Sequence, residues 1–133
     1  MDVREATPDD RAAVANVLDG AMLDTDPERL AASLDRGETL VAVAGQRDGE
    51  NGPTDDRVLG ALVLDGDRIV SVAVRRRRRG QGIGTALVER ALADREHLVA
   101  EFDERVRPFY ESLGFDSEPI QGTDGRYRAT REL

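Results

Sequence analysis

The amino-acid sequence predicts a mixed α/β fold, and two neighbouring segments in its middle support this best. The apolar run Ile69-Val70-Ser71-Val72-Ala73-Val74 is rich in β-branched residues and is typical of a buried strand. The stretch Arg79-Gly80-Gln81-Gly82-Ile83-Gly84-Thr85 follows it, and apolar residues then recur at helical spacing from Ile83 to Leu92. The order is therefore strand, glycine-rich loop and amphipathic helix.

The elements before this unit are indicated by capping and turn residues. Residues 2–6 are expected to form a short strand. Thr7 and Pro8 then serve as N-cap and first helical residue of a helix that continues to about residue 18. A second helix is expected over residues 26–37, and the glycine at its last position ends it.

Strands dominate the remaining segments. They are expected at residues 39–44 and 58–64, at 98–102, from Phe115 onward and near 126–132, with a tight turn at 65–67 leading into the strand that ends at Val74. The polar residues 46–57 are rich in Gly, Asp and Asn, so we expect a mobile hairpin loop there. One further helix is expected at about residues 106–113.

The glycine-rich loop is suited to binding a phosphate group. Alternate glycines let the backbone approach a ligand closely, and the first N–H groups and the dipole of the following helix favour an anion. A Walker loop is excluded because it needs a lysine, which the chain lacks. A dinucleotide-binding Gly-x-Gly-x-x-Gly is excluded because the position three residues after Gly82 is Thr85.

Length and composition limit the class of protein. The 133 residues are expected to form one domain, residues 1–133, with a real core. The chain has no cysteine and a single histidine, His97, which excludes disulfides and multi-histidine metal sites and argues against a Ser-His-Asp triad. No apolar run approaches the ~20 residues that span a bilayer. We therefore expect a cytoplasmic protein that needs no metal.

The charge balance is strongly acidic. Asp and Glu number 27 against 19 basic residues, all of them arginine, which gives a formal net charge of −8. Such a surface repels nucleic acid and anionic membranes, so we expect neither as a partner. The composition also resembles that of halophilic proteins, in which salt screens dense negative charge.

Two motifs together resemble the GCN5-related N-acetyltransferase (GNAT) family. Arg79, Gly82 and Gly84 fill the defined places of its acyl-CoA loop, Arg/Gln-x-x-Gly-x-Gly/Ala. The segment Pro108-Phe109-Tyr110-Glu111-Ser112-Leu113-Gly114-Phe115 is similar to the family's Phe-Tyr-x-x-Leu-Gly-Phe and follows at the family's usual separation. The resemblance covers nearly the whole chain. It implies a mixed, mostly antiparallel sheet of about seven strands, splayed between the fourth and fifth and flanked by about four helices.

The resemblance also implies how acetyl-CoA would be held. Backbone N–H groups of residues 79–85 would bind its pyrophosphate. The backbone of Val72, Ala73 and Val74 would pair with the pantetheine arm as an added strand, and one N–H there would face the thioester oxygen. Asp103 stands where the family often has an asparagine that contacts this arm. An aspartate accepts hydrogen bonds but cannot donate them, and the alternative role for Asp103 is the N-cap of the following helix.

Tyr110 occupies the position of the family's general acid. A phenol, with a reference pKa of about 10, can share its proton with a departing thiolate. The alternative is an aromatic residue that packs beside Phe109. Glu101 is a candidate base or water-holder, or else a surface charge, and many family members deprotonate the amine through ordered water. The arginine run 75–79 precedes the loop and could pair with the phosphates of CoA, with nucleic-acid binding as the competing interpretation.

The sequence therefore predicts an acyltransferase, an N-acetyltransferase that moves acetyl from acetyl-CoA to a primary amine. Direct attack in a ternary complex is expected, since no cysteine is present to form an acetyl-enzyme. A non-catalytic acyl-CoA-binding or sensor module is the alternative. The acceptor is expected to be a small-molecule or peptide amine, and a homodimer is compatible with the resemblance.

Overall fold

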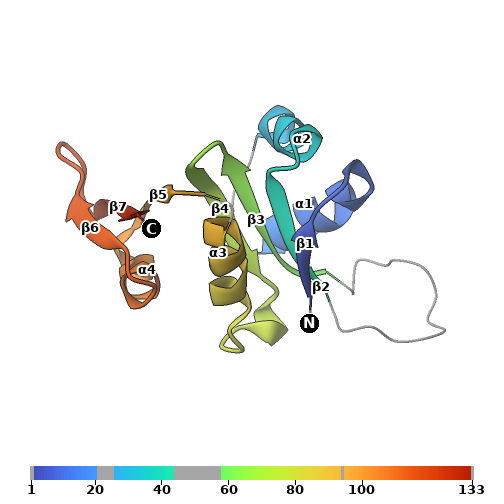
Figure 1. Cartoon of the computed structure of the whole chain (residues 1–133). Helices are drawn as coiled ribbons and strands as arrows, with labels where there is room; N and C mark the ends of the chain where they lie inside the picture. The colour runs from blue at the N-terminus through green and yellow to red at the C-terminus, as the bar shows by residue number, and fades with distance from the viewer. Residues whose placement is uncertain (1, 21–25, 44–57, 94, 133) are drawn as a thin grey trace.

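One sheet forms the frame of the computed structural model, which describes residues 2–20, 26–43, 58–93 and 95–132 (Figure 1). Its seven strands, in the order β1-β2-β3-β4-β5-β7-β6, are β1 (Asp2–Glu5), β2 (Thr39–Val43), β3 (Val58–Asp65), β4 (Arg68–Val74), β5 (His97–Asp103), β6 (Asp116–Pro119) and β7 (Arg126–Glu132). The helices are α1 (Arg11–Gly20), α2 (Pro27–Asp35), α3 (Ile83–Ala93) and α4 (Arg107–Ser112), with short 3-10 turns η1 (Pro8–Asp10), η3 (Arg76–Arg78) and η4 (Glu104–Val106). The predicted mixed sheet and the predicted order of elements are confirmed.

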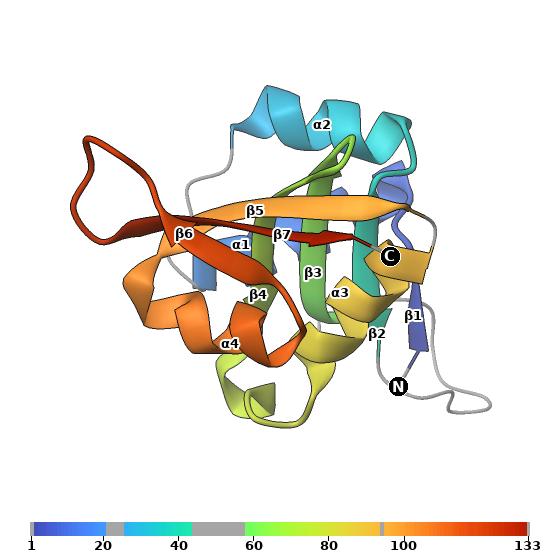
Figure 2. The ribbon, with the colours of Figure 1, turned by 60° about the vertical axis from the view of Figure 1, so that its left-hand side comes forward.

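Helices pack on both faces of the sheet (Figures 1 and 2). α1 and α2 lie on one face, over β2, β3 and β4, where buried aliphatic residues such as Val14, Leu30 and Val63 form a core. α3 lies on the opposite face, over β2 and β3, in a second core that includes Leu62 and Leu87. α4 joins this second core beside β6. The sheet therefore separates two cores.

One predicted helix begins differently from expectation. The helix expected from Thr7 starts as the 3-10 turn η1, and α1 begins at Arg11. The Asp10 side chain points back toward the start of this turn. Its carboxylate accepts hydrogen bonds from the Thr7 N–H at 2.9 Å and from Arg4 at 2.8 Å. The other observed boundaries agree with the prediction to within two residues. The hairpin loop expected at 46–57 lies outside the described residues.

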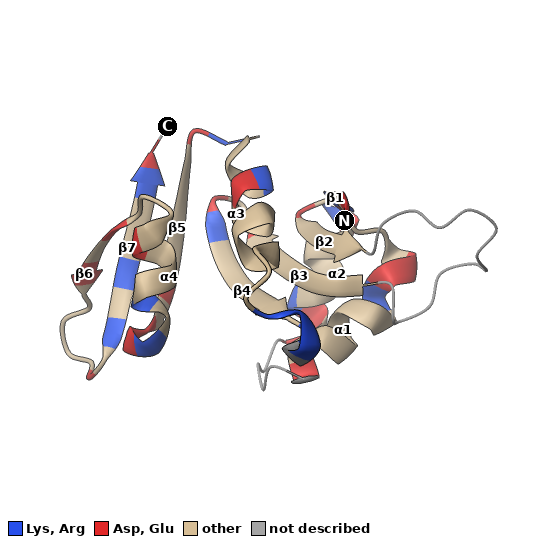
Figure 3. Cartoon of the chain, turned by 90° about the horizontal axis from the view of Figure 1, so that it is seen from below, with Lys and Arg blue, Asp and Glu red and all other residues tan. Residues whose placement is uncertain are grey.

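β4 and β5 are parallel neighbours that stay together over a short stretch. Their pairing is limited to Arg68 with Val99 and Ile69 with Ala100. Figure 3 shows the consequence: β5, β7, β6 and α4 form one half of the molecule, and the remaining strands with α1, α2 and α3 form the other. The predicted splay between the fourth and fifth strands is confirmed.

A β-bulge in β4 marks the point of separation. In the ladder with β3, Val63 pairs with Ser71 and Leu64 with Ile69, which leaves Val70 as an extra residue on β4. An extra residue bends its strand and increases the local twist. Because Val70 directly follows the last residue that pairs with β5, we attribute the separation of the two strands to this bulge.

The close approach of α3 to the sheet depends on Gly60 in β3. A Cβ atom at this position would lie 2.9 Å from the Ala73 carbonyl oxygen and 3.1 Å from the Ile83 side chain. Overpacking of this kind forces backbone shifts in a close-packed core. The first turn of α3 is therefore held directly against β3 at Gly60, which pairs with Val74 at the end of β4.

Candidate functional site

The glycine-rich loop connects the splayed end of β4 to α3. Gly80 and Gly82 adopt φ values of +80° and +82°. This left-handed conformation costs other residues roughly 1–2 kcal/mol. A Cβ atom on either glycine would meet no atom within 4 Å. The first N–H groups of α3 follow at Ile83, and such groups have no carbonyl acceptor within their own helix. Open space beside unused backbone donors fits a phosphate group.

The arginines of the run that precedes this loop differ in their contacts. Arg75 is tied to the sheet, because its Nε donates to the Val58 carbonyl oxygen at 2.6 Å. Arg79 Nε donates to the Val74 carbonyl oxygen at 3.2 Å. The side chains of residues 77–78 are exposed, and basic residues gather at this loop in Figure 3. Positive charge is therefore concentrated beside the glycines, within a chain that is acidic as a whole.

Beyond its bulge, β4 has one edge that β5 leaves open. Val72, Ala73 and Val74 pair with β3 on one side, and β5 no longer pairs with them on the other. Backbone groups on an open strand edge can add another extended chain as a strand. This edge leads into the glycine-rich loop, so the two backbone segments predicted to hold acetyl-CoA are neighbours in space as well as in sequence.

Tyr110 lies in a cluster that contains all three phenylalanines of the chain. Its ring stacks on Phe102, with centroids 4.5 Å apart and planes 10° apart, and it meets Phe109 and Phe115 edge to face at 5.0 and 5.3 Å. The residue is only 6% exposed, and this burial raises the pKa of Tyr110 to about 12. Tyr110 therefore stays protonated throughout the neutral range.

The hydroxyl of Tyr110 does not contribute a hydrogen bond to the described part of the fold. It forms no hydrogen bond with any described residue. No buried polar side-chain atom in the described ranges lacks a partner, so this hydroxyl must reach accessible surface although its ring is buried. A neutral phenol placed in this way can donate a hydrogen bond to a ligand.

The two sequence motifs meet at Gly84 and Phe109. A Cβ atom on Gly84 would lie 3.3 Å from ring carbons of Phe109, so the first turn of α3 packs against the residue that precedes Tyr110. α3 belongs to one half of the splayed sheet and α4 to the other (Figure 3). This contact places Tyr110 near the helix that follows the glycine-rich loop.

Asp103 caps a turn. Its carboxylate accepts hydrogen bonds from the Arg105 N–H at 3.0 Å and from Arg105 Nε at 3.3 Å. The backbone hydrogen bond from Arg105 is the main cause that lowers the pKa of this carboxyl. Asp103 does cap an element, as the alternative interpretation expected. The prediction that this element is the following helix was wrong. The capped element is the 3-10 turn η4, because the chain makes that extra turn before α4, whose N-cap is Val106.

Glu101 is ion-paired rather than free. Its Oε1 accepts from Arg68 at 2.8 Å and its Oε2 from Arg128 at 2.9 Å. The hydrogen bond from Arg128 is the main cause that lowers the pKa of this carboxyl. A carboxylate held by two arginines is a poor proton acceptor, so the geometry disfavours a role as general base. Sequence analysis missed both arginines, because their pairing depends on strand register.

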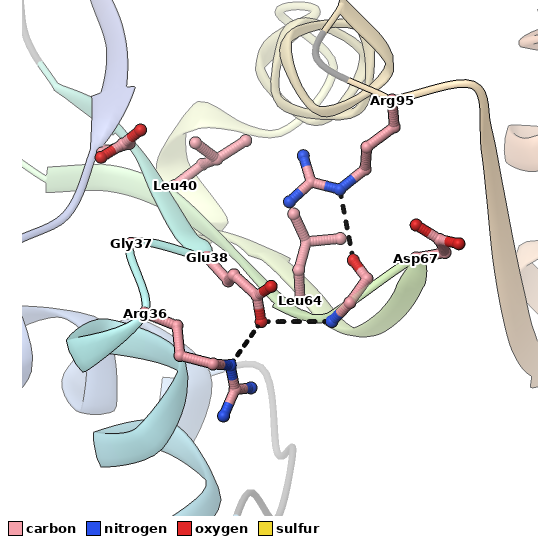
Figure 4. A pocket seen from close by; sticks show the side chains of 9 residues that line it. Arg36, Gly37, Glu38, Leu40, Leu64, Asp67 and Arg95 are labelled. Carbon is pink, nitrogen blue, oxygen red and sulfur yellow. Dashed lines mark hydrogen bonds and ion pairs between the residues drawn. The ribbon is translucent and has the colours of Figure 1, made fainter.

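The pocket in Figure 4 lies away from these groups. It is formed around the β3–β4 turn, at the end of β4 opposite to the glycine-rich loop. Its charged groups are engaged locally: Glu38 accepts from the Gly66 N–H at 3.1 Å, and Arg95 Nε donates to the Gly66 carbonyl oxygen at 3.2 Å. His97 lies at this same end, with Nε2 3.2 Å from the Asp67 carboxylate. Neither the pocket nor His97 belongs to the predicted acetyl-CoA site.

Two other kinds of feature are not found among the described residues. These ranges contain no group of three or more His, Cys, Asp or Glu that could hold a metal ion. Within the same ranges, no helix is long and apolar enough to cross a membrane.

Comparison with known proteins identifies the family. The sequence profile of the acetyltransferase (GNAT) domain matches residues 35–117. A search of curated proteins found no match. The chain belongs to the GNAT acetyltransferase family, and the predicted class of acyltransferase, an N-acetyltransferase, is confirmed.

Solved structures of low sequence identity share the fold over the whole chain. Rv2747 from Mycobacterium tuberculosis, solved in complex with CoA, is similar with a TM-score of 0.74 at 20% identity, covering 100% of this chain and 99% of that one. Ard1 from Thermoplasma volcanium has a TM-score of 0.73 at 20% identity, covering 99% and 97%. Naa50 from Arabidopsis thaliana, in complex with a bisubstrate analogue, has a TM-score of 0.74 at 16% identity, covering 99% and 98%. At such identities the likeness concerns the fold alone.

The buried phenol predicts a loss of stability in alkaline solution. An unfolded chain loses the Tyr110 proton near pH 10, whereas the folded protein keeps it to about pH 12 because burial disfavours the phenolate. The folded-state pKa is raised, so this contribution to the free energy of unfolding is complete below about pH 10 and is lost as the pH rises toward 12. Urea unfolding at a series of pH values measures it.

The control for this measurement is Tyr110→Phe, which keeps the ring packing but cannot ionise. We expect the variant to lose less stability than the wild type between about pH 10 and about pH 12. Equal losses in the two proteins would show that the phenol is not buried as described.

Proposed function

We propose that residues 1–133 form one acetyltransferase domain that moves an acetyl group from acetyl-CoA to a primary amine. The observation that carries this proposal is the continuity between the open edge of β4 and the glycine-rich loop, with the residue before Tyr110 packed on the start of the next helix. Transfer from a CoA thioester needs a place for the extended arm, a cradle for the phosphates and a donor for the leaving sulfur. This arrangement offers all three.

Backbone groups would do most of the binding of acetyl-CoA. The pantetheine arm would add to the edge of β4 at Val72, Ala73 and Val74. The pyrophosphate would accept hydrogen bonds from N–H groups of the loop that ends at Thr85, helped by the dipole of α3. The arginines at 77–79 would add positive charge beside the phosphates. Asp103 is proposed as a cap of η4 and not as a ligand of the arm.

The chain's own groups would support a direct attack. The amine nitrogen bonds to the thioester carbon and the C–S bond breaks. The nitrogen releases one proton to water, and the sulfur leaves as a thiolate that takes one proton from water. A backbone N–H on the open edge of β4 would stabilise the oxyanion, an effect worth about 3 kcal/mol in comparable sites. Tyr110 would donate a hydrogen bond to the departing sulfur. A thiol has a reference pKa of about 8.5, so a phenol with a pKa of about 12 stabilises the thiolate more readily than it gives up its proton.

The acceptor would lose its proton to ordered water, because Glu101 is held by arginines on both oxygens. A small-molecule or peptide primary amine fits the proposal. One chain of the NatC complex, whose structure was solved with Gag peptide and CoA, has the same fold, with a TM-score of 0.76 at 17% identity, which supports testing peptide amines first. We also propose that the enzyme works in the cytoplasm of a salt-adapted cell, in keeping with its net charge of −8.

Acetyl-CoA binding tests the phosphate cradle directly. We predict saturable binding by the wild-type protein in isothermal titration at about 1 M KCl, where salt screens the acidic surface. Gly82→Trp is expected to abolish binding, because the indole would fill the open space beside the loop N–H groups. No binding by a folded wild-type protein would contradict the proposed function.

The matched control for the cradle is Gly122→Trp. Gly122 has a φ of +83°, and a Cβ atom there would likewise meet nothing within 4 Å, so the substitution imposes the same backbone strain in the β6–β7 turn. This variant is expected to bind acetyl-CoA like the wild type. Loss of binding in both variants would mean that strain, and not occlusion of the cradle, is the cause.

Turnover tests the role of Tyr110. We predict that Tyr110→Phe lowers kcat about 100-fold and leaves acetyl-CoA affinity nearly unchanged, because only the hydrogen bond to the leaving sulfur is lost. The measurement is release of the CoA thiol with a panel of peptide and small-molecule primary amines. An unchanged kcat would remove Tyr110 from the chemistry. Binding of acetyl-CoA without turnover of any amine would favour an acyl-CoA sensor module.

A further inference from the structure

Glu101 occupies the point where the two halves of the sheet part. β4 and β5 pair last at Ile69 and Ala100, and Glu101 is the next residue of β5. Burial alternates along β5, and its buried residues, among them Ala100 and Phe102, pack into the core with α3 and α4. Glu101 therefore lies on the other face of the strand, just beyond the last backbone pair that joins the halves.

The Glu101 carboxylate joins three strands. Arg68 of β4 donates from Nη2 to Oε1 at 2.8 Å, across the divide between the two halves. Arg128 of β7 donates from Nη2 and Nε to Oε2 at 2.9 and 3.1 Å. That second contact stays within one half, because β5 and β7 are paired with Glu101 opposite Arg128. The two arginines thus make structurally different links to one carboxylate.

We propose that Glu101 is a positioning residue for acetyl-CoA: its ion pair with Arg68 fixes how far β5 stands from β4 where the open edge begins. The inference rests on the proposed function, because it takes the pantetheine arm to lie along that edge. Two residue pairs form the seam between the strands. A side-chain link beside so short a seam restrains the halves, and a site that is ordered in advance costs less to bind.

Long-range electrostatics makes the opposite prediction for Glu101. Acetyl-CoA is a polyanion, so removal of a negative charge would strengthen its binding if overall attraction were the only effect. If Glu101 instead positions β5 through Arg68, removal of this ion pair weakens the binding of acetyl-CoA. Glu101→Gln therefore changes the affinity in opposite directions under the two explanations. A buffer with about 1 M KCl shortens the Debye length to about 3 Å and suppresses the long-range effect.

The test compares acetyl-CoA affinities of four variants by isothermal titration. We expect Glu101→Gln and Arg68→Gln each to raise Kd about threefold to fivefold, the effect of losing one exposed ion pair. The double variant is expected to bind no more weakly than either single one, because both remove the same link. Tighter binding by Glu101→Gln, or fully additive effects, would overturn the proposal.

Arg128→Gln is the matched control. It removes an arginine from the same carboxylate but leaves the link to β4 in place, so Kd should stay within about 1.5-fold of the wild-type value. Weakening equal to that of Arg68→Gln would overturn the proposal, because it would show that the link across the divide has no special effect.

Steady-state kinetics separate positioning from base catalysis. With Glu101→Gln we expect a higher KM for acetyl-CoA, a kcat within about threefold of wild type at saturation, and an unchanged acidic limb of the pH–rate profile. A general base would instead lose about 100-fold or more in kcat together with that limb. The second result would overturn the proposal.

Hydrogen exchange of the ligand-free protein tests the link independently of acetyl-CoA. The Val99 N–H donates to the Asp67 carbonyl oxygen at 2.9 Å, at the seam between the strands. Peptides that contain Val99 are expected to exchange faster in Glu101→Gln and Arg68→Gln than in Arg128→Gln. Equal exchange in all three would overturn the link itself. Failure of the wild type to bind acetyl-CoA, with this exchange pattern intact, would instead show that the proposed function is what fails.

Discussion

The short parallel seam between β4 and β5 is the constraint on which the rest of the structure depends. A β4 strand paired along its whole length would have no free backbone on that side. The extra residue Val70 turns β4 away from β5 after Ile69, and Gly60 of the neighbouring strand β3 lets α3 pack onto the sheet beside the end of β4. The open edge, the glycine-rich loop and the start of α3 therefore all lie together at the end of β4. In this member of the GNAT acetyltransferase family, we propose that the pantetheine slot and the phosphate cradle are that continuous backbone.

The few aromatic residues of the chain gather on the other side of the splay. Phe102, Phe109 and Phe115 surround Tyr110. The Arg107 guanidinium lies over the Tyr127 ring, with its Cζ 4.5 Å from the ring centroid. α4 has six residues, too few for a stable isolated helix, so its position depends on these contacts. The chain is 35% charged. Among the described residues, its aromatic cluster surrounds Tyr110, the side chain that we propose faces the leaving sulfur. The same burial that fixes this ring also raises its pKa.

The features predicted from the sequence are those with local causes or a family pattern. The turn at the glycine-rich loop follows from glycines, and its left-handed φ values at Gly80 and Gly82 are the reason glycine is needed. The bulge at Val70 was not predicted, because it exists only relative to the register of β3. The same holds for the arginines on Glu101, which come from strands distant in sequence. A capping role was the alternative that the residue type of Asp103 suggested, but the 3-10 turn that it caps was not predicted.

The most direct test of the continuous acetyl-CoA site is a crystal structure of the protein with CoA. We expect the pantetheine arm to pair with β4 between Val72 and Val74, with the pyrophosphate on the N–H groups at Gly82 and the sulfur within hydrogen-bonding distance of the Tyr110 hydroxyl. CoA bound elsewhere, for example in the pocket beside Arg95, or a sulfur out of reach of Tyr110, would contradict it.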